Sequence, residues 1–326
     1  PGYSNINVYY GEKALEKARM FGPPNFVYDY PKNHGVITNW NSMKRLLEQI
    51  FIYELRNPPE ETRLFMIDSS FEDIQNFRKW SEIIFEFFNI KSFFHINESI
   101  PPLYALGKTT GIVINSGDSF TSVTPILNGK IIQEAAYKIH FGGYNLTLWL
   151  NKLTKNNVFK TSFEREEILY KIKEKFCFVL IDRENAIRNN ASFSETYFSE
   201  KNGNISIDKE RFECPEMLFN PGLFGLDQMG ISEMLLKSIN KCDENIRNEM
   251  MSNIVLSGGS TLFKGFKERI DKEMNSFHMP VNVIAPPDRI CETWKGGKIL
   301  ASQDNIKKQS ITKTEYDEVG LDKIIE

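Results

Sequence analysis

Apolar side chains in the first third of the chain recur at spacings that alternate between those of helices and those of strands. Between 41 and 55 they recur every three or four residues, whereas 64–68 (LFMID) is a short continuous apolar run. The pattern predicts a short charged helix over 12–19, a helix over 41–55, a strand over 64–68, a helix over 70–88, a strand over 92–97 and a short helix over 101–107. Helices and strands that alternate in this order predict an α/β fold.

Individual residues place the ends of these elements. The proline pair at 58–59 ends the first long helix, and Ser70 with Asp73 has the spacing of a capping box that opens the second. Because residues that precede proline avoid the helical conformation, we expect Glu98 to lie in the loop or first turn ahead of Pro101.

The stretch Gly111–Pro125 (GIVINSGDSFTSVTP) predicts a β-hairpin. Two β-prone runs are joined by small polar residues at 116–119, which is the pattern of a hairpin turn. Such a turn can gather backbone N–H groups into a concavity that binds an anion. An ordinary surface hairpin explains the same residues, so this stretch alone leaves open whether the tip meets a phosphate or only water.

The second part of the chain continues the alternation of elements. Gly142 and Gly143 precede a helix, where they allow either a close approach of the backbone to a ligand or a tight turn. The pattern then predicts a helix over 163–179, a hairpin that turns at 202–204, helices over 231–241 and 244–251, a strand over 253–256 and a helix over 293–303. By spacing alone, Lys173 and Glu174 on the first of these helices are typical of a solvated surface pair.

A second turn of small residues follows the strand at 253–256. Ser257–Thr261 (SGGST) separates this strand from the next helix. Small residues and a helix N-terminus at the carboxyl end of a strand favour a ligand cradle.

Composition limits the kind of protein. The chain has 326 residues, of which 41% are hydrophobic and 25% charged, which indicates a soluble globular protein large enough for two lobes. The net charge of -3 without a basic block argues against a direct nucleic-acid partner. Four widely spaced cysteines argue against a zinc site, and no apolar run reaches the length of a membrane span. The chain begins with Pro1, which is typical of a fragment or of a protein whose N-terminus is missing.

The sequence resembles actin-related proteins through strings that follow the family's order from about Asn5 to Glu318. They are YPKNHGVITNW (30–40), YELRNPPEE (53–61), LYALGKTTGIVINSGD (103–118), KIKEKFC (171–177), ERFECPEMLFNP (210–221), NIVLSGGSTLFKGF (253–266), APPDR and WKGGKILAS. Within the family, SGGSTLFKGF is most similar to centractin, the actin-related protein of dynactin's short filament.

The resemblance implies the two-lobed α/β fold that actin shares with Hsp70 and sugar kinases, with ATP or ADP and Mg in a cleft between the lobes. We expect 1–104 to be the remainder of the first lobe, 105–290 the second lobe, and 291–326 helices that return to the first. The positions that the resemblance assigns to nucleotide binding are Ser116, Gly117 and Asp118 in the second phosphate loop, Gly143 near the ribose, Lys173 and Glu174 at adenine and ribose, and Gly258, Gly259, Ser260, Leu262 and Phe263 in the adenosine-side loop.

Several positions depart from the family pattern. The hairpin that carries the family's first phosphate loop has no counterpart in this sequence. Asn115 replaces an Asp that helps to hold the water shell of the metal, and an amide cannot supply that charge or take a proton. Glu98 replaces the Gln that positions the attacking water. The other departures are Ser119 for a Gly at the loop tip, Tyr170 for an Arg near the ribose and Ile290 for a Lys at the edge of the base.

These departures predict a structural, assembly-type actin-related protein with slow or absent ATP hydrolysis. No residue is confidently catalytic and none is expected to bind metal directly. One alternative is a polymerising actin-like ATPase with a missing N-terminus. A small-molecule kinase of the same superfamily is disfavoured, because no Asp is evident as a base for a sugar hydroxyl.

The expected partners are other actin-like subunits or an actin-related complex, without direct contact to nucleic acid or membrane. Two apolar features suggest how they bind, the loop at 223–226 and a cleft near Tyr104, Ala105, Ile299 and Leu300. Core packing explains each feature equally well. The predicted location is cytoplasmic, in the cytoskeleton, with a nuclear location left open.

Overall fold

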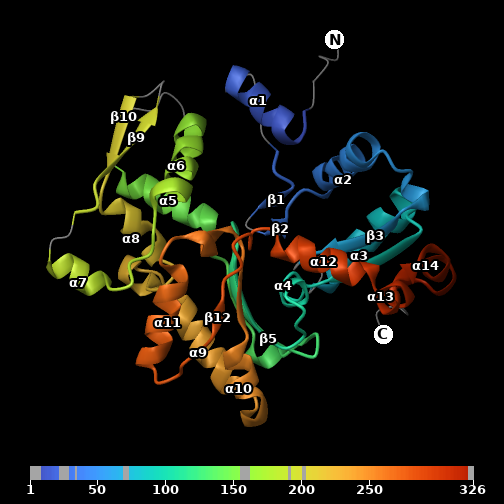
Figure 1. The fold of residues 1–326 in the computed structure, drawn as a ribbon. Coiled ribbons are helices and arrows are strands. Elements are labelled where there is room, and N and C mark those ends of the chain that lie inside the picture. The colour runs from blue at the N-terminus through green and yellow to red at the C-terminus, as the bar shows by residue number, and fades with distance from the viewer. Residues whose placement is uncertain are drawn as a thin grey trace. The chain divides into compact units, whose positions relative to one another are not determined.

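The computed structural model describes residues 9–21, 29–33, 35–68, 73–154, 162–189, 192–199 and 203–321. These residues form two compact units, whose elements are drawn in Figure 1. Unit 1 comprises the described residues within Pro1–Met66, Ser70–His95 and Gln309–Glu326, and unit 2 those within Ile67–Ser69 and Ile96–Lys308. The lobe boundaries expected at 104 and 290 stay a prediction, because the two units are defined by contacts within this chain and not by comparison with the lobes of a family.

Unit 1 contains a three-stranded sheet in the order β13-β4-β3. β4 and β13 run antiparallel, with Ile311 opposite Phe93. The strands of unit 1 are β1 (Lys32–Asn33), β2 (Val36–Ile37), β3 (Arg63–Ile67), β4 (Ser92–Ile96) and β13 (Ile311–Thr312). Its helices are α1 (Gly11–Phe21), α2 (Trp40–Gln49), α3 (Ile74–Ser81) and α14 (Lys313–Val319). The helices predicted over 12–19 and 41–55 and the strands predicted over 64–68 and 92–97 are confirmed.

The two long helices of unit 1 begin at side-chain caps and end in π-helices. Asn39 accepts a hydrogen bond from the backbone N–H of Ser42 at 3.1 Å, and Asp73 accepts one from that of Gln75 at 2.7 Å. Ser70, the other half of the predicted capping box, lies outside the described residues. The π-helices, Ile50–Leu55 and Glu82–Phe87, were not predicted from the apolar spacing.

The core of unit 1 is largely aromatic. Trp80 is 1% exposed and meets Trp40 edge to face, with ring centroids 5.3 Å apart. The ring of His95 lies 4.7 Å from that of Phe77, and burial lowers the pKa of His95 to about 4. His95 is therefore neutral at physiological pH and contributes to packing.

Unit 2 is built on a six-stranded sheet in the order β12-β11-β5-β6-β7, with β8 also paired to β6. β5 and β12 both run parallel to β11, whereas β6 runs antiparallel to β5, β7 and β8. The strands are β5 (Gly111–Ser116), β6 (Thr121–Leu127), β7 (Lys130–Ile131), β8 (Tyr137–Ile139), β11 (Ile254–Ser257) and β12 (Val283–Ile284). The predicted hairpin at 111–125 is confirmed as β5 and β6.

The helices of unit 2 match most of the predicted segments. They are α4 (Pro101–Ala105), α5 (Gly143–Leu153), α6 (Ser162–Phe176), α7 (Arg183–Arg188), α8 (Glu210–Glu216), α9 (Ile231–Lys241), α10 (Glu244–Ser252), α11 (Phe266–Ser276), α12 (Glu292–Ser302) and α13 (Asp304–Gln309). A separate hairpin is formed by β9 (Glu195–Ser199) and β10 (Gly203–Ile207). Its turn was predicted at 202–204, but Gly203 and Asn204 belong to β10, and Asn202 lies outside the described residues. Within the described ranges, we find no helix long and apolar enough to cross a membrane.

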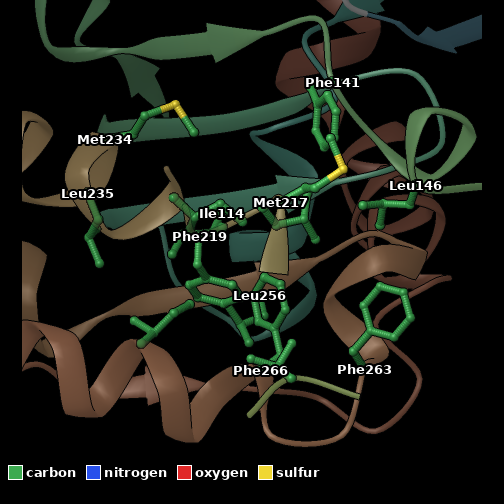
Figure 2. Packing of buried hydrophobic residues seen from close by; sticks show 14 of the residues in the cluster. Ile114, Phe141, Leu146, Met217, Phe219, Met234, Leu235, Leu256, Phe263 and Phe266 are labelled. Atoms are coloured by element: carbon green, nitrogen blue, oxygen red, sulfur yellow. The ribbon is translucent and has the colours of Figure 1, made fainter. Parts of the chain in front are cut away.

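A hydrophobic cluster holds the sheet of unit 2 against its helices. Ile114 on β5 and Leu256 on β11 are neighbours in the parallel register and are both 0% exposed. Figure 2 shows them packed among Met217, Phe219 and Phe266, and the rings of the last two meet edge to face at 5.2 Å. Full burial of each such side chain contributes about 1.5–3 kcal/mol. The ends of β5 and β11 are therefore firmly placed.

An ion pair inside unit 2 joins α8 to α11. The guanidinium of Arg269 donates to both carboxylate oxygens of Glu216, at 2.8 and 3.1 Å, and also to the carbonyl of Leu180 at 2.6 Å. Glu216 is 1% exposed and Arg269 is 6% exposed. Glu273 pairs with the same guanidinium. Because both charges are desolvated, removal of one would leave the other buried without its partner.

We expect Glu216→Gln to lower the free energy of unfolding of unit 2 by about 3 kcal/mol, since it leaves a buried guanidinium with less compensating charge. Thermal and urea unfolding of the protein would measure the change. The control is Glu233→Gln, which breaks an ion pair with Lys237 whose side chains are both 50% exposed. Because solvent screens an exposed pair, this substitution should destabilise unit 2 much less. Equal effects of the two substitutions would contradict the assignment of Glu216 as a buried structural charge.

Candidate ligand site at the ends of two parallel strands

The first element of the site is the tight turn between β5 and β6. The backbone N–H of Gly117 donates to the carbonyl of Phe120 at 3.1 Å, which closes the turn. At its base the hydroxyls of Ser116 and Thr121 lie 2.9 Å apart, and Thr121 donates to the carbonyl of Phe141 at 2.8 Å. Both hydroxyls are fully buried, so the base of the turn is rigid and its tip carries the predicted site residues Gly117 and Asp118.

The second element is the turn that follows β11. Because β11 pairs with β5 and Ser257 lies beside Asn115, the two strands end together and their turns become neighbours. The hydroxyl of Ser260 donates to the carbonyl of Gly117 at 3.0 Å. Gly258 has a φ of +87°, and a Cβ there would lie 2.4 Å from the carbonyl oxygen of Ser116. This position therefore requires glycine for both backbone conformation and space.

The third element is the glycine pair at the start of α5. The backbone N–H of Gly143 donates to the carbonyl of Gly117 at 2.9 Å, and that of Tyr144 donates to the carbonyl of Asp118 at 2.9 Å. A Cβ on Gly142 would lie 2.6 Å from the latter carbonyl oxygen. The pair allows the close backbone approach that the sequence suggested, and the approaching backbone is that of the β5–β6 turn.

Three polar atoms from different elements surround the Cα of Gly143. A Cβ at this position would lie 3.2 Å from the hydroxyl oxygen of Ser260, 3.3 Å from Oδ1 of Asp118 and 3.3 Å from Nζ of Lys173. A hydroxyl, a carboxylate and an ammonium thus converge on a residue that has no side chain. This cluster of polar atoms around Gly143 is the centre of the candidate site.

Lys173 extends from α6 to the cluster of polar atoms around Gly143. Its ammonium donates to the carbonyl of Gly143 at 2.7 Å and to the hydroxyl of Thr147 at 2.8 Å, and the side chain is buried. Burial lowers the pKa of Lys173, an effect that the nearby charge of Asp118 opposes. The solvated pair expected from spacing alone is therefore wrong for Lys173, whereas Glu174 is exposed.

Tyr170 adds a contact that the residue pattern did not reveal. Its hydroxyl donates to Oδ1 of Asp118 at 3.2 Å, and its ring lies 4.2 Å from the ammonium of Lys173. Burial, followed by the negative charge of Asp118, raises the pKa of Tyr170 above its ordinary value. A sequence signal existed only in part: Tyr170 stands one turn before Lys173 on the same helix, so the two side chains share a face.

The other predicted residues of the second turn differ in exposure. Leu262 is 42% exposed, whereas Phe263 is 9% exposed and belongs to the hydrophobic cluster of Figure 2. A Cβ on Gly259 would lie 3.5 Å from Ile290, which is itself 60% exposed. Arg289 anchors this turn, because its guanidinium donates to the carbonyl and hydroxyl oxygens of Thr261 at 2.7 and 2.9 Å.

The two positions that the resemblance links to hydrolysis lie on segments bound to the same hairpin. Asn115 is 7% exposed at the end of β5, and its Oδ1 would lie 2.7 Å from a Cβ on Gly258. Glu98 lies in the turn before α4, as predicted, and the adjacent Ser99 accepts a hydrogen bond from Thr124 of β6 at 3.1 Å. Within the described residues, no cluster of three His, Cys, Asp or Glu side chains is arranged to hold a metal ion.

The strand order, the parallel pair β5–β11 and the small-residue turns at its end define an α/β protein with a candidate ligand site at the carboxyl edge of a sheet. The sequence matches the family model for actin over residues 4–326. The chain therefore belongs to the actin family, and its two-lobed α/β fold class is confirmed. Its fold is the actin-like fold that binds nucleotides.

We expect Gly258→Ala to destabilise unit 2 by about 3 kcal/mol, since it combines a strained backbone conformation with a clash against the carbonyl of Ser116. Differential scanning calorimetry would detect the lowered unfolding temperature. The control is Gly222→Ala, where a Cβ has no neighbour within 4 Å and the backbone has no positive φ. A Gly258→Ala protein as stable as this control would show that the two turns do not meet as described.

Proposed function

We propose that this protein is an actin-related assembly subunit that binds ATP or ADP with Mg at the three turns of unit 2 and hydrolyses ATP slowly or not at all. The observation that carries this proposal is the buried amide of Asn115, which occupies the end of β5 where the two turns meet. The site keeps a shape suited to phosphate and ribose, while this central position is neutral.

The residues present fit a nucleotide. Glycines at 143 and 258 let the three turns approach one another closely, and Ser260, Asp118 and Lys173 place a hydroxyl, a carboxylate and a cation 3.2–3.3 Å from a Cβ on Gly143. In this proposal Ser116, Gly117 and Asp118 hold phosphate, Gly143, Lys173 and Glu174 face the ribose and base, and Gly258, Gly259, Ser260, Leu262 and Phe263 form the adenosine side. Bound Mg supplies positive charge against the phosphates and usually retains several waters, so it needs few direct protein ligands.

Two side chains account for the weak hydrolysis. The amide of Asn115 cannot accept a proton or add negative charge to the water shell of the metal. Glu98 carries a charge in a position where a neutral side chain would orient the attacking water, and that charge is unfavourable beside a triphosphate. Binding would then persist without efficient turnover.

We expect the full-length protein with Mg and ATP to release phosphate more slowly than ordinary actin, and Asn115→Asp to raise that rate by about tenfold or more, because it restores a carboxylate beside the phosphates. A coupled phosphate assay measures both rates. Asn128→Asp, at an exposed turn, is the matched control and should leave the rate unchanged.

Phosphate release by the unaltered protein at the rate of ordinary actin would overturn the assembly role. That result would instead favour the alternative, a polymerising actin-like ATPase. An unchanged rate in Asn115→Asp would show that the amide is not what limits hydrolysis.

The assembly role is supported by apolar side chains that unit 2 leaves exposed. Leu223 is 60% exposed in the 223–226 loop, whereas Phe224 packs against Trp149 with ring centroids 5.1 Å apart. On α12, which packs closely on α4, Ile299 is 43% exposed and Leu300 is buried. Core packing thus accounts for Phe224 and Leu300. The exposed side chains of Leu223 and Ile299 are available to partner subunits. A cytoplasmic, cytoskeletal location is part of this proposal.

We expect the tagged full-length protein to co-purify with other actin-like subunits, and Leu223→Asp to reduce their recovery several-fold because it places a charge in an apolar contact. Mass spectrometry identifies the recovered subunits, and dynactin components among them would assign the protein to the centractin-like branch. Ile187→Asp, at another exposed apolar position, is the control. A monomeric protein without actin-like partners would contradict the proposal.

A further inference from the structure

We infer that Tyr170 is a positioning residue that holds the carboxylate of Asp118 in place for the bound nucleotide. The inference rests on the proposed function, because it concerns the same site. Tyr170 stands where the family resemblance implies an arginine near the ribose, so a neutral phenol replaces a charged side chain there.

Asp118 stands at the exposed tip of the β5–β6 turn, where an unrestrained side chain would sample several rotamers. Its backbone is held through its carbonyl, which accepts from the N–H of Tyr144 at 2.9 Å. Its side chain is held by the hydroxyl of Tyr170, 3.2 Å from Oδ1. The same Oδ1 would lie 3.3 Å from a Cβ on Gly143, so the hydroxyl fixes an atom at the centre of the candidate site.

Tyr170 is itself held in place. The ammonium of Lys173 lies 4.2 Å from the centroid of its ring, and that ammonium is anchored to the carbonyl of Gly143 and the hydroxyl of Thr147. A continuous set of contacts therefore runs from the start of α5 through α6 to the tip of the hairpin. The ring of Tyr170 thus links α6 to the β5–β6 turn, which α5 also contacts through its backbone N–H groups.

A phenol suits this task beside an anionic ligand. It donates one hydrogen bond to the carboxylate without adding charge, so it orients Asp118 while the negative charge of Asp118 remains. An oriented carboxylate can accept hydrogen bonds from ligand hydroxyls without first losing rotamer freedom. Tyr170 therefore contributes to affinity through Asp118 and needs no ligand contact of its own.

The test removes only the hydroxyl. In the full-length protein, Tyr170→Phe should weaken the binding of Mg-ADP about three- to tenfold, because the freed carboxylate of Asp118 then loses rotamer freedom on binding. Isothermal titration calorimetry measures the affinity, and thermal unfolding checks that the fold is intact. Tyr197→Phe removes a hydroxyl from β9 and keeps the ring contact with Phe176, so it is the control and should bind as the unaltered protein does.

A double-mutant cycle separates positioning from a general structural effect. In an Asp118→Ala background, Tyr170→Phe should have no further effect on affinity, because its target is gone. Equal losses in both backgrounds would overturn the inference, as would an unchanged affinity of Tyr170→Phe alone. If Tyr170→Phe fails to fold, Tyr170→His and Asp118→Asn, made singly and together, complete the same cycle. Failure of the unaltered protein to bind Mg-ADP would instead overturn the proposed function, and this inference with it.

Discussion

The parallel pairing of β5 with β11 is the contact on which the candidate site depends. It places Ser257 beside Asn115, so the turns that follow the two strands leave the sheet at one edge. The register is held by buried apolar side chains such as Ile114 and Leu256, which a slip of one residue would turn to the opposite face. Hydrophobic packing within the sheet thus determines where the polar turns lie.

Close backbone approach at glycines then converts neighbouring turns into one site. Gly142, Gly143 and Gly258 all lie where a Cβ would crowd atoms of another segment, and hydrogen bonds from Gly143 and Ser260 converge on the carbonyl of Gly117. The buried ammonium of Lys173 completes the arrangement because its donors are satisfied by Gly143 and Thr147. Such a cation is stable in a dry position only because these acceptors are present.

Compared with the actin-family pattern that the sequence resembles, the candidate site differs in its charges more than in its shape. Asn115 is neutral at the meeting point of the turns, and Tyr170 holds Asp118 through a neutral phenol. Both residues preserve packing and hydrogen bonding while they change charge and proton-transfer capacity. In the function that we propose, this combination favours a nucleotide that stabilises the fold of an assembly subunit over one that is turned over rapidly.

Periodicity in the sequence was sufficient for most elements, including α9, α10 and the β5–β6 hairpin, because apolar spacing directly reflects which face of a helix or strand is buried. The motif strings were sufficient for the family. The π-helices, the burial of Lys173 and the bond from Tyr170 to Asp118 were decided only by the tertiary structure. Each depends on partners from other segments of the chain, and the spacing of residues along one segment contains no information about which side chains another segment brings to it.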